Sequence, residues 1–131
     1  MNIRTGIDHI EISRIAKAMK KTRFLPRYFG ARELVYFEQR KLAPATVAVG
    51  FCAKEAFAKA LGTGIRGFAL REVELLREEG GRPFLAFSGK AAALVKASGL
   101  HFEVSVSHDR QYALAQVIGY EGGNSRADSN K

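Results

Sequence analysis

Cysteine and long apolar runs are scarce in this sequence, and each shortage excludes a class of protein. Cys52 is the single cysteine, so no internal disulfide can form, which favours the reducing cytoplasm. Apolar runs fall far short of the roughly 20 residues of a membrane-spanning helix, and the first residues, which include Asp8, lack the layout of a signal peptide. We therefore expect a cytoplasmic protein with no membrane partner and with Cys52 in its core.

Three familiar site motifs are missing as well. One cysteine and three histidines are too few for a structural zinc site. The glycine-rich segment 62–67 follows a predicted helix, whereas a Walker-type phosphate loop precedes its helix. Ser107, His108 and Asp109 are adjacent, whereas the members of a nucleophilic triad come from separated elements. The sequence thus gives no sign of these three kinds of chemistry.

Basic residues are in excess and cluster near the N-terminus. The 131 residues carry a net charge of +8, and nearly half are hydrophobic, enough for one domain with a real core. The cluster comprises Arg14, Lys17, Lys20, Lys21, Arg23, Arg27, Arg32, Arg40 and Lys41. Such a segment attracts polyanions. Nucleic acid, an anionic membrane surface and a small acidic protein are the candidate partners, beside a solvated face with no partner.

The first half of the chain has the pattern of one strand followed by helices. Residues 3–10 are predicted as a strand, and apolar residues at helical spacing predict a helix over 11–21. A second helix is expected over 31–41. The longest helix is expected over 44–61, because proline opens it and Gly62 is a natural C-terminal stop.

The second half changes to a β pattern. Residues 68–76 and 82–87 flank a Glu-Gly-Gly turn and predict a hairpin. A short helix over 90–98 precedes two further strands, at 102–107 and 112–118. The first of these strands alternates apolar and polar residues. Helices that come first and strands that come later favour an α+β fold with an antiparallel sheet.

The domain is expected to span residues 1–120. Residues 121–131 are rich in glycine, serine, asparagine and charge, and are predicted to be a disordered tail.

Three groups of polar residues could carry chemistry. Asp8 ends a strand, as a cap, a surface residue or a metal ligand. Glu55 and Lys59 have helical i, i+4 spacing and form either an exposed ion pair worth roughly 0.3–0.5 kcal/mol or, given their apolar neighbours, a partly buried carboxylate that needs a cation. The segment 105–110 is either a well-bonded turn or a site for phosphate contact or proton transfer.

Five segments resemble motifs of the holo-acyl-carrier-protein synthase family, both in their residues and in their order along the chain. The opening segment, 6–15, reads GIDHIEISRI, and the most specific segment, 53–65, reads AKEAFAKALGTGI. The other three are 24–37, 81–84 and 104–117. The resemblance extends to about residue 119, with every motif in family order.

This resemblance implies a transferase activity and a fold. Members of the family move 4′-phosphopantetheine from coenzyme A to a serine of apo acyl carrier protein, with release of adenosine 3′,5′-bisphosphate, for fatty acid biosynthesis. The implied fold is a single α+β domain of the phosphopantetheinyl transferase type, with an antiparallel sheet packed against the long central helix. The implied assembly is a homotrimer with active sites at the subunit interfaces.

The resemblance also assigns the reaction centre. Asp8 and Glu55 are implied as the ligands of Mg²⁺, which suits oxygen ligands and retains waters, although Mn²⁺ would also suit them. Glu55, Lys59 and Asp109 remain the candidates for the general base.

Two substrates are assigned to two sets of residues in the same way. The residues implied for coenzyme A are Lys59, Gly62, Thr63, Ser107 and His108. The residues implied for the acidic carrier protein are Arg14, Arg23, Phe24 and Arg27.

Two departures and two alternative functions stay open. His9 stands where the family usually has an apolar residue, and Gly50 where many members have arginine. A small basic nucleic-acid-binding domain would also explain the charge, but no nucleic-acid motif is present and nucleic acid is not an expected partner. The second alternative is a carrier-binding homologue without catalysis.

Overall fold

The computed structural model describes residues 2–122. In chain order its elements are β1 (Ile3–Glu11), α1 (Ile12–Ala18), α2 (Phe24–Tyr28), α3 (Ala31–Gln39), α4 (Pro44–Leu61), the 3₁₀ turn η1 (Leu70–Glu72), β2 (Val73–Arg77), β3 (Pro83–Phe87), α5 (Gly89–Ser98), β4 (Leu100–His108) and β5 (Tyr112–Glu121). None of these helices is long and apolar enough to cross a bilayer.

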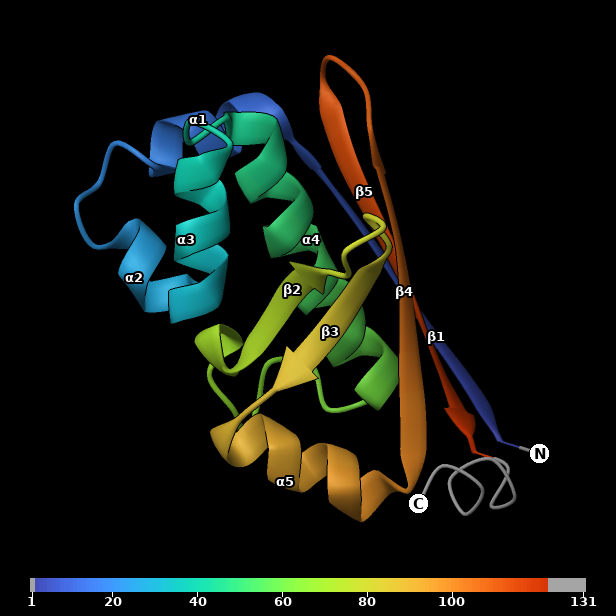
Figure 1. Cartoon of the computed structure of the whole chain (residues 1–131). Helices are drawn as coiled ribbons and strands as arrows, with labels where there is room; N and C mark the ends of the chain where they lie inside the picture. The colour runs from blue at the N-terminus through green and yellow to red at the C-terminus, as the bar shows by residue number, and fades with distance from the viewer. Residues whose placement is uncertain (1, 123–131) are drawn as a thin grey trace.

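One antiparallel sheet and one long helix form the centre of the molecule. The sheet has the strand order β1-β5-β4, and β2 and β3 form a separate hairpin. Figure 1 shows every helix and the hairpin on the same side of this sheet. Along β5, Ala113, Ala115 and Val117 are buried towards α4, while Leu114 and Ile118 face outward and are exposed. The predicted α+β fold, an antiparallel sheet against a long helix, is confirmed.

Small residues let β1 lie directly on α4. A Cβ atom added to Gly6 would be 2.0 Å from the carbonyl oxygen of Ala56 and 2.7 Å from the amide nitrogen of Ala60. These atoms are backbone and cannot move aside, so only glycine fits at this position. The contact fixes which residues of β1 lie opposite each turn of α4.

A buried ion pair joins the other side of α4 to its neighbours. Lys54 and Glu33 are both fully buried, and the Lys54 ammonium donates a hydrogen bond of 2.5 Å to Glu33 Oε1. Burial raises the pKa of Glu33 and lowers the pKa of Lys54, and their mutual attraction opposes both shifts. Within residues 2–122, every buried side-chain nitrogen and oxygen has a hydrogen-bond partner.

Several boundaries differ from the sequence-based expectations. The first helix begins at Ile12, because Glu11 still pairs with Tyr112 at the end of β1, and it ends at Ala18. Helix α3 ends at Gln39, since Lys41 adopts a left-handed backbone with φ of 59°. Helix α2 was not predicted. Its Pro26 lies in the first turn, where no intrahelical N–H bond is required.

The later boundaries differ at the hairpin and at the C-terminus. The first hairpin strand begins at Val73 rather than at residue 68, because 68–72 form a loop and the η1 turn. Strand β5 continues to Glu121, one residue beyond the expected domain boundary. The predicted disordered tail falls largely on residues 123–131, which lie outside the described part of the chain.

The contact between β1 and α4 predicts a strong effect of a single methyl group. Gly6→Ala should lower the free energy of unfolding by about 1–3 kcal/mol, because the added Cβ forces backbone to move. Gly80→Ala is the matched control, since a Cβ at Gly80 meets no atom within 4 Å. Urea unfolding of both variants measures the difference. Equal stability of G6A and G80A would contradict the close approach.

Candidate functional site

Asp8, Glu55 and Lys59 converge where β1 crosses α4. Gly6 contacts the helix at Ala56 and Ala60, so Asp8, two residues further along β1, is directed at the same turns. The Lys59 ammonium donates to the carbonyl of Ile7 at 2.8 Å and lies 3.4 Å from Asp8 Oδ1. The side chain of Asp8 is 20% exposed and that of Lys59 is 54% exposed. Lys59 therefore pairs with the strand.

The electrostatics of the cluster disfavour two carboxylate charges. Burial raises the pKa of Glu55, the charge of Asp8 raises it further, and Lys59 lowers it. Cys52 lies close to this cluster, and burial together with the charges of Asp8 and Glu55 raises the pKa of its thiol to about 12. Cys52 is fully buried, as expected, and its Sγ contacts the carbonyl of Ala113 at 3.5 Å. Its thiol is therefore protonated and inert at neutral pH.

The donor set fits a hard divalent cation. Two carboxylates that repel each other would be stabilised by a positive ion between them. No group of three or more histidine, cysteine, aspartate or glutamate side chains placed to hold a metal occurs within residues 2–122, so an ion here would take its remaining ligands from water and from phosphate oxygens. Mg²⁺ is bound in proteins in this way.

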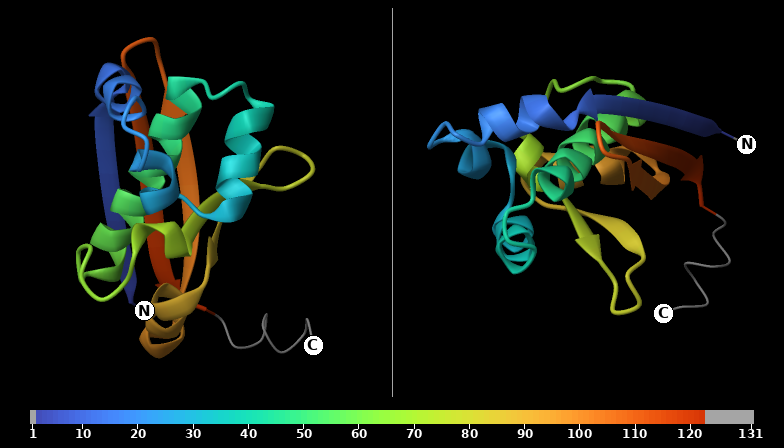
Figure 2. Two further views of the ribbon diagram at one scale, coloured as in Figure 1. Left: turned by 90° about the vertical axis from the view of Figure 1, so that its left-hand side faces the viewer. Right: turned by 90° about the horizontal axis from the view of Figure 1, so that it is seen from above.

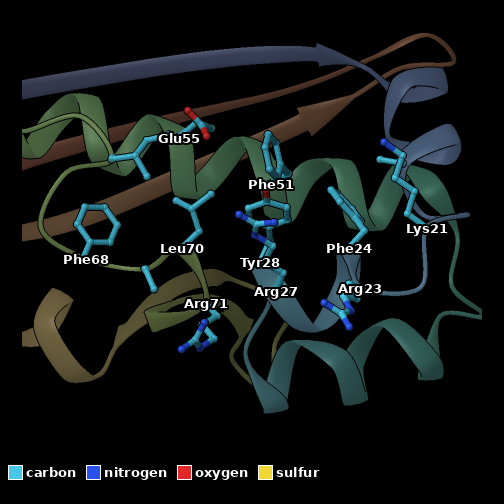
Figure 3. Close-up of a pocket in the computed structure, with 13 residues that line it drawn as sticks. Lys21, Arg23, Phe24, Arg27, Tyr28, Phe51, Glu55, Phe68, Leu70 and Arg71 are labelled. Atoms are coloured by element: carbon cyan, nitrogen blue, oxygen red, sulfur yellow. The ribbon is translucent and has the colours of Figure 1, made fainter.

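A pocket of about 630 Å³ adjoins the cluster, and Glu55 belongs to its lining. It lies between α2, α4 and the segment 65–71, as Figure 3 shows. Its aromatic rings pack on one another, with ring centroids 6.3 Å apart for Phe24 and Phe51 and 6.1 Å apart for Tyr28 and Phe51. The apolar lining includes Phe24, Tyr28, Phe51, Phe68 and Leu70. The basic lining consists of Lys21, Arg23, Arg27 and Arg71.

The pocket combines predicted residues with residues that the sequence did not reveal. Arg23, Phe24 and Arg27 line it as a group, whereas Arg14, on the exposed surface of α1, is not part of the lining. Arg71 was missed because residues 68–76 were predicted as a strand. The turn η1 instead brings that segment to the pocket, facing α2.

The end of the β4–β5 pair is separate from the carboxylate cluster. His108 pairs with Ala113 of β5, whereas Asp8 lies on β1, on the other side of β5. Two interstrand spacings and a shift of two residues along the strands therefore separate the Cα atoms of Asp8 and His108, roughly 12 Å in all. Ser107 and His108 are exposed. Within one chain, these two residues do not join Asp8 and Glu55.

Asp109 has a local structural role. Its Oδ1 accepts hydrogen bonds from the backbone N–H groups of Gln111, at 2.8 Å, and Tyr112, at 2.7 Å. These bonds, that to Tyr112 first, lower the pKa of Asp109. Asp109 thus shapes the connection between β4 and β5. Gly62 and Thr63, by contrast, directly follow α4, one turn after Lys59.

The two departures from the family pattern lie outside the cluster. His9 is exposed on the outer side of the sheet and stacks on Tyr112 with ring centroids 5.8 Å apart. Gly50 is buried, and a Cβ there would lie 3.3 Å from Phe37 and 3.7 Å from the carboxylate of Glu33. Position 50 therefore points into the contact between α4 and α3.

Comparisons with known proteins give one consistent family. A model of the 4′-phosphopantetheinyl transferase superfamily matches residues 4–117. A holo-acyl-carrier-protein synthase from Clostridium beijerinckii is 41% identical over 119 residues, which are 90% of this chain and 97% of that protein. One from Koribacter versatilis is 43% identical over 122 residues, 90% of this chain and 98% of that protein.

Solved structures agree. The synthase of Neisseria meningitidis is similar with a TM-score of 0.84 and 30% identity, covering 89% of this chain and 97% of that one. The synthase of Bacillus anthracis in complex with coenzyme A (3′,5′-ADP) has a TM-score of 0.77 and 30% identity, covering 91% and 96%.

The raised pKa of Glu55 predicts a stabilising substitution. An ionised carboxylate whose folded-state pKa is raised costs stability at every pH above that pKa, and the cost disappears as the pH falls to the unfolded value near 4.5. Glu55→Gln should therefore raise the thermal midpoint by a few degrees at neutral pH without divalent metal, and the gain should fade in acid.

Circular-dichroism melts between about pH 4.5 and 7.5 would measure this dependence. Glu38→Gln is the control, because Glu38 is an exposed acid of α3. A lower midpoint for E55Q than for wild type at neutral pH would contradict the repulsion between Asp8 and Glu55.

Proposed function

Because the chain belongs to the holo-acyl-carrier-protein synthases of the 4′-phosphopantetheinyl transferase superfamily, we propose that it transfers 4′-phosphopantetheine from coenzyme A to a serine of apo acyl carrier protein. One observation supports the assignment of this function to particular residues: Asp8, Glu55 and Lys59 converge beside a basic and aromatic pocket. Fatty acid biosynthesis is the process that needs such a modified carrier, and a cytoplasmic location suits it.

Asp8 and Glu55 are proposed to hold Mg²⁺, and Lys59 to contact the phosphates of coenzyme A. When bound, Mg²⁺ would neutralise the pyrophosphate and polarise the phosphorus under attack. Lys59 is half-exposed and already within 3.4 Å of Asp8 Oδ1, so its ammonium can turn to an incoming phosphate oxygen. Gly62 and Thr63, one turn further along, would contact the same substrate.

The reaction itself exchanges one phosphorus–oxygen bond for another. The carrier serine oxygen bonds to the β-phosphorus, the bond to adenosine 3′,5′-bisphosphate breaks, and the serine proton passes to a base. Glu55 and Asp109 are two candidates for this base, and backbone hydrogen bonds from Tyr112 and Gln111 lower the pKa of Asp109 and weaken it as a base. Lys59 is the third candidate.

The pocket is proposed to receive the carrier protein. An apolar floor with a rim of arginine and lysine fits an amphipathic helix that carries acidic residues at its edges. Arg23, Phe24 and Arg27 would contact this helix from one wall, and Arg14 would extend the basic surface along α1. Charge complementarity of this kind speeds association, and the apolar contacts add affinity.

The outer face of the sheet supports self-association. The two further views in Figure 2 show that the helices lie against one face of the sheet. The other side carries an apolar patch of exposed side chains: Ile3 (58%), Ile7 (54%), Leu114 (40%) and Ile118 (40%). Ser107 lies on this face opposite Leu114. We propose a homotrimer that buries this patch and in which Ser107 and His108 serve the coenzyme A site of a neighbouring subunit.

Two other functions predict different behaviour. In a nucleic-acid-binding domain the basic residues would be expected beside aromatic residues on exposed strands, but here they border an apolar pocket with a carboxylate at its edge. A homologue that only binds carrier protein would keep the pocket without needing Asp8. Neither would produce metal-dependent modification of the carrier.

Mass spectrometry of apo acyl carrier protein incubated with the protein, coenzyme A and Mg²⁺ tests the function. A gain of about 340 Da, one phosphopantetheine, is expected, and metal chelation by EDTA or Asp8→Ala should abolish it if the transfer needs the metal. Glu38→Ala, which changes an exposed acid away from the site, should leave it intact. Absence of modification with several carrier proteins and a folded enzyme would contradict the proposal.

Introduction of a charge on the outer sheet face tests the assembly. Ile118→Asp should convert a trimer into monomers in size-exclusion chromatography with light scattering, and should also reduce transfer, because a buried unpaired charge disfavours the interface. Val35→Asp is the control, since Val35 is similarly exposed but lies on α3. A wild-type monomer with full activity would contradict a shared site.

A further inference from the structure

Lys54 lies outside the reaction centre but is bonded to the segments that form the pocket. Its ammonium donates to the carbonyl of Leu70, at 3.3 Å, and to the carbonyl of Val73. Leu70 and the next residue, Arg71, line the pocket. Lys54 itself lies on α4 between Phe51 and Glu55, which line the pocket from the helix.

The partner of Lys54 extends the connection to the remaining wall. Glu33 Oε1, which accepts the Lys54 ammonium, also accepts the backbone N–H of Gly30 at 2.9 Å. Gly30 follows α2, which carries Phe24 and Tyr28 of the pocket. Glu33 Oε2 accepts the N–H of Leu75 on β2 at 3.0 Å.

We propose that Lys54 is a positioning residue that holds the α2, α4 and η1 walls of the carrier-binding pocket at a fixed separation. The inference rests on the proposed function of the pocket. Beyond that, it identifies a residue of the α4 motif that contacts no substrate and yet sets the affinity for one of the two substrates.

Hydrogen bonding, rather than the volume of the side chain, distinguishes this role from ordinary packing. A methionine would fill much of the same space. It would remove the Lys54 donor from the carbonyl of Val73, leave the carbonyl of Leu70 with the Val73 N–H alone, and leave the Glu33 carboxylate without its counter-charge. Buried groups do not remain unpaired. The segments that carry them would shift towards water, and the pocket would widen.

A second set of bonds keeps the fold together when Lys54 is removed. Glu74 on β2 accepts the backbone N–H groups of Arg32 and Glu33, at 2.9 and 3.2 Å, and the Arg32 guanidinium. These bonds attach the start of α3 to the hairpin independently of Lys54. We therefore expect a folded variant with a loosened pocket.

The coenzyme A site is anchored on a different side of α4. Asp8 and Lys59 are placed by the contact of Gly6 with the helix backbone, which does not involve Lys54. Removal of Lys54 should consequently affect the carrier protein far more than coenzyme A. General destabilisation of the fold, by contrast, should change the KM values for the two substrates alike.

Steady-state kinetics of Lys54→Met with each substrate varied in turn tests the inference. The KM for carrier protein should rise about tenfold or more, while the KM for coenzyme A changes less than about threefold. Val117→Ala is the control for general destabilisation, because it shortens a fully buried core side chain on β5 that does not line the pocket. Arg27→Glu is the positive control for weakened carrier binding.

Hydrogen exchange provides a readout that needs no activity. The amides of Gly30 and Leu75, both bonded to Glu33, should exchange faster in K54M than in V117A at equal distance below each melting temperature. If the wild type transfers no phosphopantetheine, the proposed function fails, and the exchange measurement still decides whether Lys54 holds the walls.

Two outcomes would overturn the inference. One is a folded K54M whose carrier KM and amide exchange match those of V117A. The other is failure of both K54M and the double variant Glu33→Gln/Lys54→Met to fold. The double variant removes the carboxylate charge that K54M leaves unpaired, so its failure would mean that the whole domain, rather than the pocket, depends on Lys54.

Discussion

The position of β1 against α4 is the constraint on which the rest of the structure depends. Gly6 brings the strand within van der Waals contact of the helix backbone at Ala56 and Ala60, a distance that no side chain would allow. Because side chains alternate along a strand, this one contact directs Asp8 towards the helix and leaves Ile7 outward. The carboxylate cluster and the apolar outer face both follow from it.

Helix α4 carries charge on two sides, and the two charged groups are handled differently. Lys54 is fully buried and fully paired, so its charge is compensated within the fold. Glu55 is half-buried beside Asp8, and its pKa is raised by burial and by the charge of Asp8, which Lys59 offsets only in part. A charge left uncompensated by the protein is a place for an external cation, and such sites commonly lower stability in exchange for function.

Local patterns in the sequence were sufficient for the elements and insufficient for their contacts. Pro44 and Gly62 bound the long helix correctly, and alternation identified β4, because both signals are local. Helix α2 was missed because its five residues are too few to show a helical period. The Lys54–Glu33 pair was missed because the sequence does not show which of two adjacent charged residues, Lys54 or Glu55, is buried. Only the packing of α3 and β2 on α4 makes Lys54 a buried partner and leaves Glu55 as a ligand candidate.

The functional residues show the same limit at longer range. Asp8 and Glu55 are far apart in sequence, and no spacing rule joins them. The resemblance to a family implied their pairing, and the strand–helix contact supplies its physical reason. Ser107 and His108 lie on β4, which β5 separates from β1 and Asp8. The outward apolar side chains of β1 and β5 are the surface on which the proposed assembly rests. The same alternation that buries alanine against α4 exposes these apolar side chains on the opposite face.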